Sequence, residues 1–247
     1  MIAALPMYDR PETAAANDRL WQGIRASLGY GPETLTRDGD LWDIWQSPDL
    51  LLAQTCGYPF RARLHPHVQL IGTPVLALPD CPPGQYCSAI VIRADDPREV
   101  PQDFATARFA YNEALSQSGW AAPQNWAAAR GFAFSNPIRT GAHRASAMAV
   151  TEGRADIAAI DALTWEILRT HDRFTDNLRV LARTDPTPAL PYITARTRDP
   201  APIFAALQSA IAGLSRADRA TLGITGVIRL PASEYLNMPN PPPPPPN

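Results

Sequence analysis

Three polar turns in the middle of the chain carry side chains that could bind a small anion. The first reads Ser116-Gln117-Ser118-Gly119 and follows an expected strand over residues 108–111. The second is Gly141-Ala142-His143, and the third is Asp161 at the end of another expected strand. Each turn opens an expected helix, whose first N–H groups are unpaired and carry a partial positive charge. Together with the hydroxyl and imidazole groups, they predict an anion site at one edge of a sheet.

Each of these side chains also has a structural explanation. Ser116 and Ser118 either hold an anionic head group or cap the helix, a role worth about 1 kcal/mol. His143 either donates a hydrogen bond to the anion or packs at its helix N-terminus. Asp161 ends an apolar strand, where an unpaired carboxylate is costly, so it needs a partner. Capping the helix that begins at Ala162 would supply one.

The elements that position these turns alternate between strand and helix. The expected strands cover residues 2–5, 50–54, 68–73, 88–93, 108–111, the residues leading into Thr140, 155–160, 178–183 and 191–195. The expected helices cover residues 11–27, 119–129, 142–152, 161–170, 200–214 and 215–222. This alternation predicts an α/β fold with mostly parallel sheets.

Two breaks in the alternation, near residues 95–101 and 184–191, divide the chain into lobes. The outer lobe is expected to be discontinuous, over residues 1–96 plus 190–240, and the middle lobe is expected over 97–189. Two crossings between two lobes are typical of a hinged protein that binds its ligand in a cleft. Residues 241–247 form a proline-rich tail that we expect to be extended and exposed.

Composition excludes several classes of function. The chain has 247 residues and a formal net charge of −2, which gives no basis for binding nucleic acid or an anionic membrane. All 22 basic residues are arginine, which removes Schiff-base and P-loop lysine chemistry. No apolar run approaches the roughly 20 residues that span a bilayer. The first residues read as a strand without a leader, so we expect a periplasmic location if a signal was removed and a cytoplasmic one otherwise.

The sequence gives little basis for catalysis or a metal site. Cys56, Cys81 and Cys87 are close in sequence, and either two of them pair in an oxidising compartment or all stay reduced and buried. There is no Cys-x-x-Cys, so we expect no metal and no cofactor. Cys56 with His143 and Asp161 would supply a nucleophile, base and orienting acid, but their spacing follows no nucleophile-elbow pattern. We therefore expect a binding protein rather than an enzyme.

The three turns carry a resemblance to a known family. From Ile2 to about Leu236 the chain resembles the substrate-binding proteins of phosphate, phosphite and phosphonate ABC transporters, which have the type II periplasmic binding protein fold. Residues 116–119 stand where the family has a Ser-Thr-Ser-Gly turn that grips the phosphonate oxyanion, with Gln117 in place of the threonine. Residues 141–143 match the family's Gly-x-His turn, and residues 158–161 match its Ala-Ala-Val-Asp strand end, whose Asp binds a ligand ammonium.

The resemblance implies two α/β lobes joined by a two-crossing hinge, with the ligand cleft between them. It implies a monomeric solute-binding protein that closes over a small anionic, phosphate- or phosphonate-like ligand for an ABC transporter permease. The expected ligand contacts are Tyr8, Tyr58, Asn112, Ser116, Gln117, Ser118, His143 and Asp161. Two alternatives use the same fold: a cytoplasmic small-molecule sensor, which the missing export signal favours, and an enzyme that uses the cleft.

Overall fold

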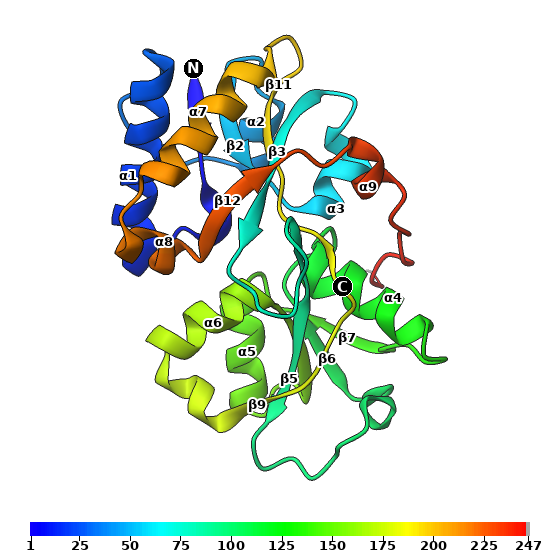
Figure 1. Cartoon of the computed structure of the whole chain (residues 1–247). Coiled ribbons are helices and arrows are strands. Elements are labelled where there is room, and N and C mark those ends of the chain that lie inside the picture. The colour runs from blue at the N-terminus through cyan, green and yellow to red at the C-terminus, as the bar shows by residue number, and fades with distance from the viewer. Residues whose placement is uncertain (246–247) are drawn as a thin grey trace. The chain divides into compact units, whose positions relative to one another are not determined.

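The computed structural model describes residues 1–245, which fold into two units (Figure 1). The first unit contains Met1–Gln85 and Pro188–Asn237, and the second contains Tyr86–Thr187 together with the chain from Met238. The chain therefore passes between the units three times. Two of the crossings lie in the short strands β4 (Gln85–Tyr86) and β10 (Thr187–Pro188), which pair with each other.

The first unit is built on one five-stranded sheet. Its order is β1-β2-β11-β3-β12, with bounds Ile2–Ala4, Leu50–Gln54, Tyr192–Ala195, Val68–Leu76 and Ile224–Ile228. The apolar core on one face includes residues of α1 (Pro11–Leu28), α7 (Pro200–Gly213) and α8 (Arg216–Leu222). The core on the other face includes residues of α2 (Leu41–Gln46), η2 (Phe60–Leu64) and α9 (Ala232–Leu236). Ala3 and Ala4, neighbours on β1, belong to opposite cores, as the strand period of two requires, whereas Leu51 and Leu52 of β2 share one core next to an irregularity in the β1–β2 register.

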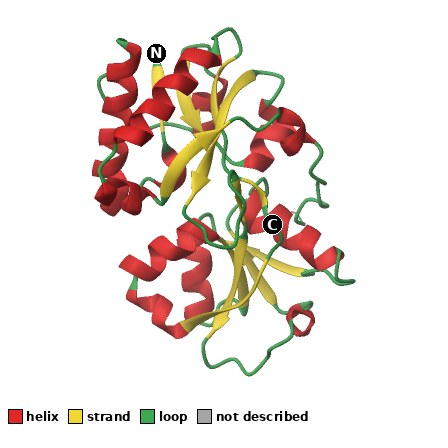
Figure 2. Cartoon of the chain, in the orientation of Figure 1, coloured by secondary structure: helices red, strands yellow, loops and turns green. Residues whose placement is uncertain are grey.

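The second unit has its own five-stranded sheet. Its order is β7-β6-β8-β5-β9, with bounds Asn136–Arg139, Arg108–Tyr111, Ile157–Asp161, Ser88–Arg93 and Leu178–Arg183. The helices that follow its strands are η4 (Gln117–Ala121) continuing into α4 (Ala122–Ala128), α5 (His143–Thr151) and α6 (Ala162–His171). Figure 2 shows the strands of this unit in the middle, with helices packed beside them. Four strands of this sheet, β5, β6, β8 and β9, were predicted to within about two residues at either end, and for β7 only its end near Thr140 was predicted.

Both sheets are mixed, so the prediction of mostly parallel sheets was wrong. In the second unit β5 runs antiparallel to β8 and β9, whereas β6 runs parallel to β7 and β8. In the first unit β11 runs antiparallel to both β2 and β3. Both β5 and β11 follow a crossing directly. A parallel neighbour needs a crossover of a dozen or more residues, and no helix precedes either strand to supply one.

The divisions between the units also differ from the expected lobe boundaries. We placed residues 1–96 in the outer lobe, but β5 belongs to the second unit and the chain crosses after Gln85. The second crossing, after Thr187, is two residues earlier than expected. The proline-rich tail was expected to be exposed, and Pro242, Pro243 and Pro245 are exposed, whereas Pro241 is buried. The tail belongs to the second unit. A short strand, β12, and the helices α2 and α9 were missed.

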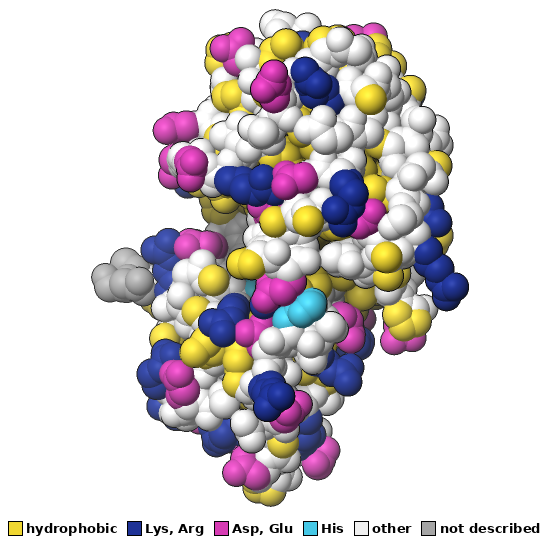
Figure 3. Space-filling view, turned by 90° about the vertical axis from the view of Figure 1, so that its left-hand side faces the viewer, with side chains coloured by type: hydrophobic (Ala, Val, Ile, Leu, Met, Phe, Trp, Pro, Cys, Tyr) yellow, Lys and Arg dark blue, Asp and Glu magenta, His cyan; other side chains and the backbone are white. Residues whose placement is uncertain are grey.

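The surface agrees with the near-neutral composition. In Figure 3 acidic and basic side chains lie interspersed over the face shown. Across residues 1–245, no helix is long and apolar enough to cross a membrane.

Candidate anion-binding site

The first polar turn connects β6 to η4 and is tightly held. The Ser116 hydroxyl accepts a hydrogen bond from Gly119 N at 2.9 Å, so Ser116 is the N-cap of η4. Its backbone carbonyl accepts from the N–H groups of Trp120 and Ala121. Ser116, Gln117 and Ser118 are all at most 5% exposed. The turn therefore has little freedom, and it places Ser118 in the first turn of a helix whose N-terminal N–H groups lack intrahelical acceptors.

The second turn is fixed directly beside the first. The N–H groups of Thr140 and Gly141 donate to the carbonyls of Tyr111 and Asn112, at 2.9 and 3.0 Å. Gly141 has φ +86°, a left-handed conformation that favours glycine. His143 then begins α5, and its Nε2 lies 3.0 Å from the Ser118 hydroxyl oxygen. This hydrogen bond joins the two helix N-termini that the sequence singled out.

The imidazole of His143 is uncharged at neutral pH. Burial lowers its pKa to about 4, because the charged form is poorly solvated there. A neutral imidazole carries one N–H, so it either donates to the Ser118 oxygen from Nε2 or accepts the Ser118 hydroxyl there. The other nitrogen, Nδ1, is buried, and a backbone hydrogen bond with Ala159 raises the pKa and partly offsets the effect of burial. His143 can thus act as a neutral hydrogen-bonding group.

The third turn meets the first through β5. Asp161 is 2% exposed and caps α6 by accepting from Thr164 N at 2.9 Å. Ser88 lies opposite Asp161 in the antiparallel ladder, and its hydroxyl donates to the Ser118 carbonyl at 2.8 Å. The helix-capping explanation of Asp161 is therefore realised. The carboxylate also lies at the same sheet edge as Ser118 and His143.

Gln117 and Asn112 complete this edge. The Gln117 amide lies 3.4 Å from the Thr187 hydroxyl and is buried. Asn112 is half-buried, and its Oδ1 is shielded from solvent without a hydrogen bond from any described residue. The structure therefore brings together six of the eight predicted ligand contacts: Asn112, Ser116, Gln117, Ser118, His143 and Asp161.

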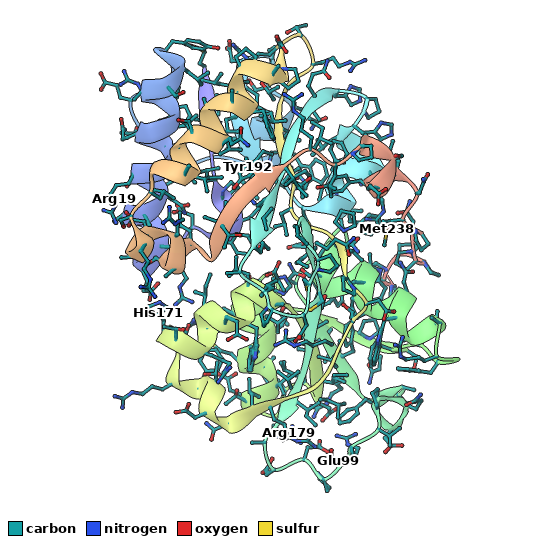
Figure 4. All side chains as sticks on the ribbon, in the orientation of Figure 1. Arg19, Glu99, His171, Arg179, Tyr192 and Met238 are labelled. Carbon is teal, nitrogen blue, oxygen red and sulfur yellow. The ribbon has the colours of Figure 1, made fainter. Side chains whose placement is uncertain are left out.

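The two predicted tyrosines belong to the first unit and lie in different surroundings. Tyr8 lines a small cavity together with Asn17, Gln54 and Tyr192. Figure 4 labels Tyr192, the first residue of β11 in the sheet of the first unit, and burial raises its pKa. Tyr58 is 7% exposed, and the guanidinium of Arg61 lies over its ring at 4.3 Å. Tyr58 and Arg61 are three residues apart on one helical turn, a spacing that could have indicated this contact.

The comparisons with known proteins decide the family. A family model described as the periplasmic phosphonate substrate-binding protein of ABC transporters matches residues 47–235, well over half of the chain. The chain belongs to this family. The predicted family resemblance is confirmed, and with it the solute-binding role for an ABC transporter. Among curated protein sequences, none matches the chain.

Solved structures of phosphonate-binding proteins and of a sensor domain share the fold of this chain. PhnD1 from Prochlorococcus marinus, solved with methylphosphonate, aligns with a TM-score of 0.75 at 16% identity, over 96% of this chain and 94% of its own. A binding protein component of an ABC phosphonate transporter from Pseudomonas aeruginosa aligns with a TM-score of 0.72 at 15% identity, over 96% and 83%. A histidine kinase sensor domain aligns with a TM-score of 0.62 at 20% identity, over 92% and 97%. These likenesses confirm the α/β periplasmic binding protein fold.

Several polar residues at this edge of the sheet were not among the predicted ligand contacts. Ser88 lies on β5, and Thr184 directly follows β9. The backbone N–H of Ser88 donates a hydrogen bond to the Thr184 hydroxyl at 2.9 Å. Thr140 contacts Ser146 through their hydroxyl oxygens, 2.6 Å apart. Ser88 and Thr184 meet because β5 pairs antiparallel with its neighbours, and Thr140 and Ser146 meet because of the fold of the second turn. Neither of these features has a local sequence signal. Across residues 1–245, no three His, Cys, Asp or Glu side chains lie close enough to hold a metal ion.

Proposed function

We propose that the polar edge of the second unit binds the oxyanion of a phosphonate. The hydrogen bond between Ser118 and His143 carries the proposal, because it places two helix N-termini and two hydrogen-bonding side chains around one point. Backbone N–H groups at helix starts bind phosphate-like anions through their local positive charge. Asn112, Ser116 and Gln117 hold or extend this turn, as the burial of Ser116 and Gln117 and the shielded Oδ1 of Asn112 support.

Neutral donors suffice for such a ligand. The His143 ring is uncharged at neutral pH, so its contribution is a directed hydrogen bond rather than an ionic contact. Hydrogen bonds to an ionised partner are shorter and about twice as strong as neutral ones. The affinity for the oxyanion would therefore come from several charge-assisted hydrogen bonds within a rigid turn.

The carboxylate of Asp161 favours a ligand that also carries an amine. A purely anionic ligand would be repelled by a buried carboxylate at the same edge, whereas an aminoalkylphosphonate places an ammonium beside it. Asp161 can serve this ligand while it caps α6 through Oδ1. We propose an aminoalkylphosphonate as the preferred substrate.

Tyr8 and Tyr58 remain proposed ligand contacts of the first unit. Tyr8 is the better supported of the two, because it borders a cavity, whereas the ring of Tyr58 is covered by Arg61. We propose further that the protein works as a monomer that delivers its ligand to a permease. A Tyr8→Phe variant tests whether Tyr8 contacts the ligand, because loss of the hydroxyl should then lower the affinity for the phosphonate.

Calorimetric titration of the protein tests the proposal. The ligands are 2-aminoethylphosphonate, methylphosphonate, phosphate, phosphite and, as a control anion, sulfate. We expect saturable binding of at least one phosphonate, and at 100 times its dissociation constant a stabilisation of roughly 2.7 kcal/mol. Binding of none of the phosphorus oxyanions would refute the proposed function.

Variants then locate the site. Ser118→Ala removes the hydroxyl that is hydrogen-bonded to His143. It should weaken phosphonate binding by about ten- to a hundredfold, the range for a hydrogen bond to a charged group. Ser135→Ala is the matched control, because its hydroxyl donates to the Ala105 carbonyl in the same unit at an exposed position. Equal effects of the two substitutions would place the ligand elsewhere.

A further inference from the structure

The end of the chain is docked on the second unit by two hydrogen bonds. The indole Nε1 of Trp120 donates to the Pro242 carbonyl at 3.0 Å. The side-chain amide of Asn125 donates to the Pro239 carbonyl at 2.9 Å. Pro241, between the two acceptors, is buried. Figure 1 shows the red C-terminal segment beside α4, and Figure 4 labels Met238, where the segment enters the second unit.

The two acceptors are three residues apart, which is one turn of a polyproline II helix. Such a helix has three residues per turn and rises about 3.1 Å per residue, so the carbonyls of Pro239 and Pro242 face the same side about 9 Å apart. Trp120 lies on η4 and Asn125 five residues later on α4. The two donors therefore bind two acceptors of the tail that lie three residues apart. The prolines of the segment have no N–H, so they offer only their carbonyls as backbone hydrogen-bonding groups.

The Trp120 side chain also packs against the core of the second unit. It is 3% exposed, and its ring centroid lies 4.9 Å from that of Tyr111 and 6.4 Å from that of Phe109, both on β6. An indole fixed by the core, with its N–H directed at a carbonyl, is the feature by which aromatic grooves bind proline-rich segments. The ligand is also preorganised, because a run of prolines loses little backbone entropy on binding.

We propose that Trp120 and Asn125 form a polyproline-recognition surface on the second unit, occupied by the chain's own segment Pro239–Pro245. The surface is independent of the phosphonate site in its chemistry, since it recognises neutral carbonyls and proline rings. When the segment is replaced by one that does not adopt the polyproline II conformation, the surface takes a separate polyproline peptide instead.

Hydrogen exchange of the Trp120 indole N–H, followed by NMR on the full chain, tests the proposal. In a variant with Ser at positions 241–245, exchange should speed up by at least about tenfold, as expected for a lost hydrogen bond and its packing. A synthetic peptide with the sequence of residues 238–247 should restore the slow exchange. A peptide of the same length with Ser in place of every proline should not.

Point variants separate recognition from folding. Asn125→Ala removes only the contact with Pro239 and should speed exchange at Trp120 while the thermal unfolding transition stays cooperative. Trp120→Phe should abolish peptide binding, whereas the matched change Trp42→Phe in the first unit should not. Unchanged exchange in both the Ser-tail and Asn125→Ala variants, or equal peptide binding by Trp120→Phe, would overturn the proposal. Slow exchange that depends on protein concentration, with dimers in light scattering, would overturn the intramolecular assignment.

Discussion

The side chain of Asn112 lies in the space that a side chain on residue 119 would need, and residue 119 is glycine. A Cβ atom on residue 119 would overlap the Asn112 Oδ1 and would also approach the Ser116 hydroxyl at 3.1 Å. The loop after β6 and the first turn of η4 therefore fit together only because residue 119 lacks a side chain. Since Ser116 caps η4 through Gly119 N, this contact also supports the turn that carries Ser118.

Substitution Gly119→Ala should consequently weaken the turn. The added methyl group must displace the Asn112 side chain or the Ser116 cap, and overpacking of this kind costs about 1–3 kcal/mol. Urea unfolding measures the loss of stability, and phosphonate affinity should fall with it. The double variant Asn112→Ala/Gly119→Ala should recover part of the stability, because the overlapping oxygen is gone. No recovery would mean that the Ser116 contact, not Asn112, limits the site.

Asp96 should stabilise the second unit until the solution becomes strongly acidic. Hydrogen bonds from Arg98, at 2.9 and 2.6 Å, lower the pKa of this carboxyl to about 2 from 3.8. Because the folded-state pKa lies below the unfolded one, the stabilisation is complete above about pH 4 and is lost as the pH falls towards 2. Asp96→Asn should cost about 2 kcal/mol at pH 7. Asp95→Asn, at a neighbouring carboxylate that is 88% exposed, should cost far less.

His143 should make stability pH-dependent in a higher window. Its folded-state pKa is about 4, below its ordinary 6.5, so between these values the unfolded chain binds more protons. Stability should therefore be unaffected by this residue above about pH 6.5 and should decrease as the pH falls towards 4. Urea unfolding at pH 5, 6, 7 and 8 measures the slope. His143→Gln should reduce that slope, and an unchanged slope would show that the ring is not buried in the folded protein.

Local sequence was sufficient to predict the three turns, because capping chemistry is local. Ser116 accepts from a backbone N–H three residues ahead, and Asp161 does the same for α6. Gly141 has the left-handed backbone that its residue type suits. The sequence also predicted that the turns meet at one sheet edge, and the Ser118–His143 hydrogen bond agrees with it.

The parts that the sequence did not predict depend on contacts between distant segments. Ser88 joins the site only because β5 runs antiparallel to β8, and the strand pattern of residues 88–93 is the same for either direction and either unit. The contacts of the tail were not predicted either, because the donors to Pro242 and Pro239 are the side chains of Trp120 and Asn125, more than 110 residues earlier in the chain. Partner choice of this kind has no local signature.

Asp161 should decide between phosphonates with and without an amine. Asparagine is as good an N-cap as aspartate, so Asp161→Asn should leave α6 and the thermal stability nearly unchanged while it removes the charge. Loss of a buried charge pair should weaken the binding of 2-aminoethylphosphonate by at least about tenfold. Methylphosphonate has no ammonium and loses a repulsive carboxylate, so its affinity should hold or rise.

Calorimetry with both ligands measures this difference. Asp185→Asn is the matched control, because this carboxylate is in the same unit and 72% exposed, with Arg130 at 3.6 Å. It should leave both affinities unchanged. If Asp161→Asn left the ratio of the two affinities unchanged, the ligand would carry no cation beside Asp161.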